Sequence, residues 1–136
     1  MISKLLPRCL MAAPMFLVAA AAFAHHSFAT FDMSKQVTLT GTVKEFQWQN
    51  PHIWIYLLVK NQDQTDVWEV EGGSVVGLKR EGWSKDAFKP GDKITVTIHP
   101  KRDGTHGGSF VQGTTADGKT LGKPNETQVT ATPKAS

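Results

Sequence analysis

The stretch VTLTGTVKEFQWQNPHIWIYLLVK, residues 37–60, contains two segments in which apolar and polar side chains alternate on either side of a Gln-Asn-Pro turn. One face of the second segment, residues 52–60, is entirely aliphatic and consists of Ile53, Ile55, Leu57 and Val59. A period of two is typical of a strand with one buried face. The stretch therefore predicts two strands joined by a short turn, with Gly41 indicating a bend or bulge in the first.

The same alternation returns further along the chain, interrupted by turn signals such as Lys-Pro-Gly-Asp at residues 89–92. The expected elements are a third strand over residues 66–71, then a short helix that begins after Ser74 and stops at Gly82, and a further helical turn over residues 84–88. A fourth strand over residues 94–99 and a fifth strand through Phe110 and Val111 follow. A brief edge strand over residues 119–121 ends the domain.

Three strands, a short helix and two strands are the element order of the OB fold. We therefore expect an all-β domain with one short helix, a five-stranded OB-like Greek-key barrel over residues 37–121. A small open β-sandwich would use the same alternation. An N-terminal arm over residues 25–36 precedes the barrel, and residues 122–136 have so few apolar side chains that we expect a disordered tail.

Residues 1–24 have the pattern of an export signal. Lys4 and Arg8 precede an apolar stretch that is too short to span a bilayer, and Ala22-Phe23-Ala24 supplies the small-x-small pattern that signal peptidase accepts. Cleavage after Ala24 would leave a mature chain that starts at His25. The sequence thus predicts a periplasmic or secreted protein with no membrane span after processing.

Charge and cysteine content exclude several classes of protein. The formal net charge of +3 includes Lys4 and Arg8, so the processed chain is closer to neutral. With no basic stripe, nucleic-acid binding has no support. The single cysteine, Cys9, lies in the expected signal, so the mature chain has no disulfide, no thiolate nucleophile and no cysteine metal ligand. We expect a monomer that packing alone holds together.

The histidine pair behind the expected cleavage site predicts a metal site. If His25 is the first residue, its α-amine and imidazole can chelate one ion together, and His52, placed after the Asn50-Pro51 turn, can supply a third nitrogen. Three nitrogens in a tetragonal arrangement suit Cu(II). His26 is a further candidate ligand or a neighbour. Copper is accordingly the candidate cofactor, with His25, His26 and His52 as the candidate metal ligands.

A structural role for these histidines stays open beside the metal site. Terminal histidines are often solvated, and a histidine at the start of a strand often makes only hydrogen bonds. His99 and His106 flank or occupy the loop between the fourth and fifth strands, and in an OB barrel this loop shares a mouth with the loop before His52. His106, among glycines, is a candidate ligand-binding residue.

The tryptophans predict a different site. Trp54, Tyr56 and Trp68 could line a stacking face on the second and third strands, where OB folds bind sugars or bases. The alternative is that the tryptophans fill the core, which we favour for Trp68 and Trp83. Trp48, Trp54 and Tyr56 remain candidate ligand-binding residues.

Several segments together resemble a known family. AHHSF at the processing site, VTLTGTV, QNPHIW, GSVVGLKREGW and KPGDKITV are similar to domain-of-unknown-function family 6152, a family of small exported bacterial proteins with no assigned activity. The resemblance covers residues 25 to about 121. It implies a periplasmic address and a small β-barrel, and it matches His25, His26 and His52 to the family's motif residues, whereas His99 and His106 lie outside the matched segments.

These observations predict an exported protein that binds a small ligand, with Cu(II) held by an N-terminal histidine brace. The alternative is a metal-free envelope interaction module that binds a sugar, peptide or protein partner through an aromatic face. A third reading, a copper-dependent oxidase, would need an open substrate surface beside the metal. Glu69 and Glu71 share a strand face as paired carboxylates would, but no catalytic motif accompanies them. Enzyme activity is therefore left open.

Overall fold

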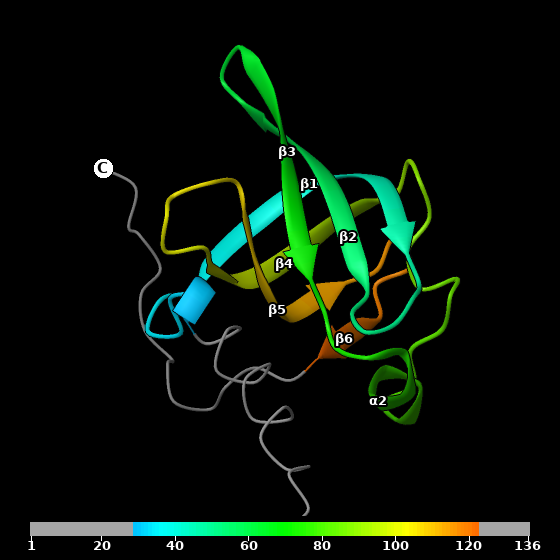
Figure 1. The fold of residues 1–136 in the computed structure, drawn as a ribbon. Coiled ribbons are helices and arrows are strands. Elements are labelled where there is room, and N and C mark those ends of the chain that lie inside the picture. The colour runs from blue at the N-terminus through cyan, green and yellow to red at the C-terminus, as the bar shows by residue number, and fades with distance from the viewer. Residues whose placement is uncertain (1–28, 123–136) are drawn as a thin grey trace, which may run out of the picture.

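The computed structural model describes residues 29–122, and their strands form a closed five-stranded β-barrel (Figure 1). The elements are β1 (Val37–Gln47), β2 (Trp54–Asn61), β3 (Gln64–Glu71), α2 (Val75–Arg80), β4 (Lys93–Pro100), β5 (Gly107–Thr114) and β6 (Thr120–Gly122). The expectation of an all-β barrel with one short helix is confirmed. Its finer assignment to the Greek-key OB type stays a prediction.

Strand pairing runs in the order β3-β2-β1-β4-β5-β6, and all of these neighbours are antiparallel. A parallel pairing of Glu69–Glu71 with Gly107–Ser109 joins β3 to β5 and closes the barrel. β6 extends β5 as a short edge, as the Asp-Gly turn before it predicts. The β2–β3 hairpin projects beyond the barrel at the top of Figure 1, and α2 lies at the opposite end.

The barrel interior is aliphatic, as the alternation of β2 predicts. Ile53, Ile55 and Leu57 are fully buried, while Trp54 and Tyr56 between them point outward and stay partly exposed. The core is completed by buried residues of β1, β3, β4 and β6 and by Leu78, Trp83 and Phe88 from α2 and the segment after it, and Phe110 of β5 packs against it. Burial of this apolar surface is the main stabilising term for a domain without disulfides.

The connection between β3 and β4 follows the predicted signals with one difference. Ser74 caps α2, accepting a hydrogen bond from the Gly77 amide at 3.3 Å, and the chain leaves the helix through Gly82. The further helical turn expected over residues 84–88 is instead a turn closed by the Ala87 amide on the Ser84 carbonyl at 3.1 Å. Trp83 and Phe88 on either side are buried, and packing of these rings holds the segment.

Gly41 does not mark the irregularity of β1. The register of β1 against β2 shifts between Val43 and Glu45. At Gly41 itself the backbone of β2 comes so close that an added Cβ would lie 2.6 Å from the Leu58 carbonyl oxygen. Gly41 therefore permits close approach of two strands.

Gly41→Ala is expected to lower the free energy of unfolding by about 1–3 kcal/mol, because the new methyl group forces β1 and β2 apart. Urea denaturation measures the difference. Gly73→Ala is the matched control, since its Cβ would meet only the Leu78 side chain at 3.6 Å, an ordinary contact. Equal stability of the Gly41→Ala variant and the natural protein would contradict the close approach.

Candidate functional site

The segment before β1 is attached to the end of β4 through its backbone. Phe31 forms a β-bridge with Lys101, the Asp32 amide donates to the Pro100 carbonyl at 2.8 Å, and the Arg102 amide donates to the Thr30 carbonyl at 2.9 Å. Phe31 is buried, with 5% of its surface exposed. The part of the N-terminal arm that the structure describes is thus fixed against the barrel.

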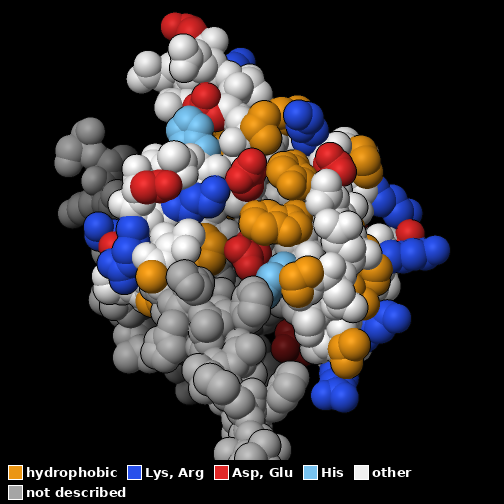
Figure 2. All heavy atoms as spheres, viewed as in Figure 1, with side chains coloured by type: hydrophobic (Ala, Val, Ile, Leu, Met, Phe, Trp, Pro, Cys, Tyr) orange, Lys and Arg blue, Asp and Glu red, His pale blue; other side chains and the backbone are white. Residues whose placement is uncertain are grey.

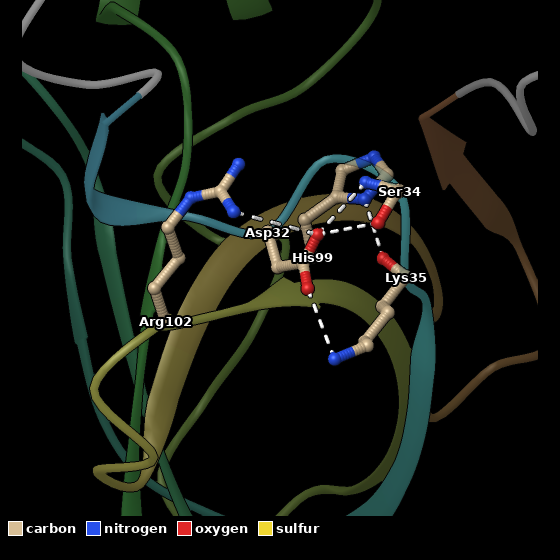
Figure 3. A network of polar contacts seen from close by, with 5 residues as sticks. All are labelled: Asp32, Ser34, Lys35, His99 and Arg102. Atoms are coloured by element: carbon tan, nitrogen blue, oxygen red, sulfur yellow. Dashed lines mark hydrogen bonds and ion pairs between the residues drawn. The ribbon is translucent and has the colours of Figure 1, made fainter.

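A polar network around Asp32, the Asp32 clasp, fixes the same segment (Figure 3). The Asp32 carboxylate accepts hydrogen bonds from the Ser34 hydroxyl at 2.6 Å and the Ser34 amide at 3.2 Å, and it forms ion pairs with Lys35 at 3.1 Å and Arg102 at 3.9 Å. Buried His99 donates from Nδ1 to the Lys35 carbonyl at 2.7 Å. The hydrogen bonds from Ser34, followed by that from Lys35, lower the pKa of Asp32 from 3.8 to about 2.

The docked arm forms one wall of a cavity of about 330 Å³. Its apolar walls are Phe31, Met33 and Phe110, and its polar side chains are His52, Glu71 and Ser109. Arm, β3, β5 and the loop before β2 all contribute. The cavity is therefore assembled from four segments that lie far apart in the sequence.

One ring nitrogen of His52 forms polar contacts within the described part of the protein, and the other does not. Its Nδ1 lies 3.1 Å from the Gly72 carbonyl oxygen and 3.3 Å from Glu71 Oε1, so Nδ1 carries the proton and donates to these acceptors. Nε2 is then unprotonated in the neutral ring, and among the described residues it has no hydrogen-bond partner. The side chain is 42% exposed. An imidazole whose second nitrogen donates to a carbonyl or carboxylate is the usual arrangement of a metal-binding histidine.

The loop that carries His52 is held from both sides. The Asn50 side chain accepts a hydrogen bond from the Val75 amide at the start of α2, at 3.1 Å. After His52, the Ile53 amide donates to the Gly73 carbonyl and the Gly72 amide returns a bond to the Ile53 carbonyl. The residues of the Asn-Pro-His motif thus tie the loop to α2 and to the end of β3.

A model of a family of unknown function, DUF6152, matches residues 13–110, which is more than half of the chain. The chain belongs to this family. Neither the comparison with curated proteins nor the one with solved structures found a match. The expected family resemblance is confirmed, and the family brings no activity to its member.

The structure separates the histidines that the sequence singled out. Of those that it describes, His52 lines the cavity, His99 is buried against Lys35, and His106 stacks on Trp68 with ring centroids 4.9 Å apart. His25 and His26 lie outside the described residues. Between residues 29 and 122 no group of three or more His, Cys, Asp or Glu side chains could hold a metal ion.

The tryptophans also divide. Trp54 and Tyr56 lie side by side on the outer face of β2, whereas Trp48 packs against Phe46 with ring centroids 5.8 Å apart and Trp68 is partly buried against the core. In Figure 2, hydrophobic side chains over β2 and β3 alternate with carboxylates. Strand register places Glu71 opposite Trp54, and Glu45 and Glu69 on either side of Tyr56. Two of the predicted stacking residues therefore share one surface.

Sequence reasoning noted Glu71 only as half of a possible carboxylate pair with Glu69. Glu71 and Glu69 share a strand face, but they have different partners: Glu71 contacts His52, and Glu69 pairs with Lys101 at 3.1 Å. Asp32 and Met33 were not singled out. The Asp-x-Ser pattern at residues 32–34 is typical of a turn in which a carboxylate accepts from the backbone two residues on, and it could have indicated the clasp.

The part of the chain that the structure describes includes no helix long and apolar enough to cross a membrane.

The Asp32 clasp predicts a pH dependence of arm docking. Because hydrogen bonds from Ser34 and then Lys35 hold the pKa of Asp32 at about 2, below its ordinary value of 3.8, the ionised carboxylate stabilises the turn that docks the arm above about pH 4, and this contribution is lost as the pH falls through 2. The Ser34 amide resonance, followed by NMR from pH 6 to pH 1.5, should report an apparent pKa near 2.

Asp32→Asn should shift the Ser34 resonance toward that of an undocked chain already at pH 6. Asp117→Asn is the matched control: a hydrogen bond from the Thr115 hydroxyl lowers the pKa of Asp117 in the same way, but in the turn between β5 and β6. A Ser34 titration that is unchanged in Asp32→Asn, or abolished in Asp117→Asn, would show that Asp32 is not the group that holds the arm.

Proposed function

We propose that this protein is an exported monomer, periplasmic or secreted, that binds one Cu(II) ion through the α-amine and imidazole of His25 and the imidazole of His52. The single observation that carries the proposal is that Phe31 of the docked arm and His52 line the same cavity. An extended chain from His25 to Phe31 spans at most about 20 Å, and this limit is the distance over which a mature N-terminus at His25 could reach His52.

The chemistry of the site fits this use. Nε2 of His52 is the nitrogen left for a metal, since Nδ1 is committed to Gly72 and Glu71. The α-amine has an ordinary pKa of roughly 7.7–8.0, so a tightly bound copper ion can displace its proton at neutral pH. Cu(II) heads the affinity order of divalent first-row metals and prefers nitrogen ligands in a plane. His26 is either a further ligand or a neighbour of the site, and the site serves binding, transfer or sensing of copper.

The authentic N-terminus decides this proposal. Intact mass of the exported protein gives the cleavage position, and electron paramagnetic resonance with Cu(II) then compares that form with one that has a single alanine ahead of His25. We expect a nitrogen-rich tetragonal spectrum from the authentic form only. A cleavage site elsewhere, or identical spectra from the two forms, contradicts the brace.

Two substitutions test the described half of the site. His52→Ala should remove one nitrogen from the spectrum, while the control His106→Ala, a histidine away from the cavity, should leave it unchanged. Glu71→Gln should weaken Cu(II) binding by about 10-fold or more, because the carboxylate that helps orient the His52 ring is lost. Unchanged affinity in both His52→Ala and Glu71→Gln would exclude His52 as the third ligand.

A metal-free interaction module is the second candidate function, and the outer surface around Trp54 and Tyr56 favours it. Aromatic rings beside the carboxylates of Glu45, Glu69 and Glu71 can contact a cationic peptide through both stacking and charge. A neutral sugar would contact only the aromatic rings of Trp54 and Tyr56.

If this surface is the binding site, Trp54→Ala should abolish binding of a short lysine- and arginine-containing peptide, detected by calorimetry, and an extra residue ahead of His25 should have no effect. A neutral oligosaccharide serves as the competing probe. Binding of neither probe by the natural protein would leave this surface without the proposed role.

A further inference from the structure

The cavity beside His52 contains a sulfur atom. Met33 lines it together with His52 and Phe31, and its side chain is 40% exposed. Single exposed apolar side chains are common on protein surfaces. This one, however, contributes little to the core and stands in the wall of a cavity whose polar lining includes an imidazole.

The backbone fixes where Met33 stands. Met33 is the first central residue of a turn in which the Lys35 amide donates to the Asp32 carbonyl at 3.1 Å. Both ends of this turn are attached to β4, at Asp32 through the Pro100 carbonyl and at Lys35 through His99. The Asp32 clasp (Figure 3) therefore holds a flexible thioether side chain on a stiff turn at the cavity wall.

Thioether sulfur and imidazole nitrogen form a ligand pair with a distinct metal preference. A thioether is a soft ligand that selects Cu(I), whereas imidazole binds copper in either oxidation state. No thiol of the mature chain would compete, because the only cysteine of the sequence is Cys9. The Glu71 carboxylate, a hard ligand, is already in contact with His52 Nδ1.

We propose that Met33 and His52 together bind Cu(I), so that the cavity holds copper in both oxidation states. This inference rests on the copper site proposed above and adds a ligand to it. In the Cu(II) form nitrogen atoms supply the ligands, and in the Cu(I) form the Met33 thioether joins the His52 imidazole. The site would thus bind copper that arrives either as Cu(I) or as Cu(II), and Met33 sets its affinity for Cu(I).

The sequence allows a direct test, because Met33 is the only methionine after residue 24. The exported protein, labelled with methyl-¹³C-methionine, is titrated without oxygen with Cu(I) supplied as its acetonitrile complex. The Met33 methyl resonance should shift, and the shift should be complete at one equivalent. Val76→Met provides the matched control, since it adds a methyl group on α2, at a position 55% exposed and away from the cavity. The resonance of this added methyl should not move.

Affinity supplies the second readout. Met33→Leu retains an apolar side chain of similar size but removes the sulfur. It should bind Cu(I) at least about 10-fold more weakly in competition with bicinchoninate, since removal of even an outer partner of a metal ligand has an effect of that size. The Cu(II) resonance spectrum of Met33→Leu should equal that of the natural protein.

Failure of this inference differs from failure of the proposed function. A Met33 resonance that Cu(I) does not shift, or Met33→Leu with unchanged Cu(I) affinity, overturns the Met33–His52 pair even when the Cu(II) spectrum depends on the authentic N-terminus. A shifted Met33 resonance with weakened Cu(I) binding in Met33→Leu supports the pair even when the Cu(II) spectrum ignores the N-terminus, in which case the brace alone is wrong.

Discussion

The parallel contact between β3 and β5 is the constraint on which the rest of the molecule depends. It runs from Glu69 to Glu71 on one strand and from Gly107 to Ser109 on the other. A Cβ on Gly107 would lie 2.9 Å from the Glu69 carbonyl oxygen, so a larger residue would push the strands apart. Closure gives β3 a second partner and covers an edge that would otherwise be open to other chains. The same contact sets Glu71 beside Ser109 and so forms the floor of the cavity.

Local patterns predicted much of this architecture, and their limits have a physical cause. Period-two alternation identified β1, β2 and β4, Ser74 identified the start of α2, and the Asp-Gly turn identified β6, because each depends on residues close in sequence. By contrast, the barrel closes at Gly107 because the backbones of β3 and β5, two strands distant in the sequence, come close together. No side-chain period records this approach, so only the strand count and the helix position favoured a barrel over a sandwich.

The candidate site shows the same division. His52 was identifiable because the residues before it, Asn50 and Pro51, indicate a stiff turn. Its partner Glu71 could not be identified from the sequence, because Glu69 lies on the same strand and faces the same side. Only the positions of Lys101 and His52 in space distinguish the two carboxylates. The Asp32 clasp joins Asp32 to the end of β4, which lies far along the sequence. Patterns of neighbouring residues could therefore not predict this contact.

The bridge between Phe31 and Lys101 also determines the order in which the molecule can be assembled. The arm is made early in synthesis, and the strand end that receives it follows about 70 residues later, before β5 and β6. Contacts between such distant segments form late, since the chain between them must first be ordered. It follows that the cavity is complete only when β5 has joined the barrel, because Ser109 and Phe110 also line it.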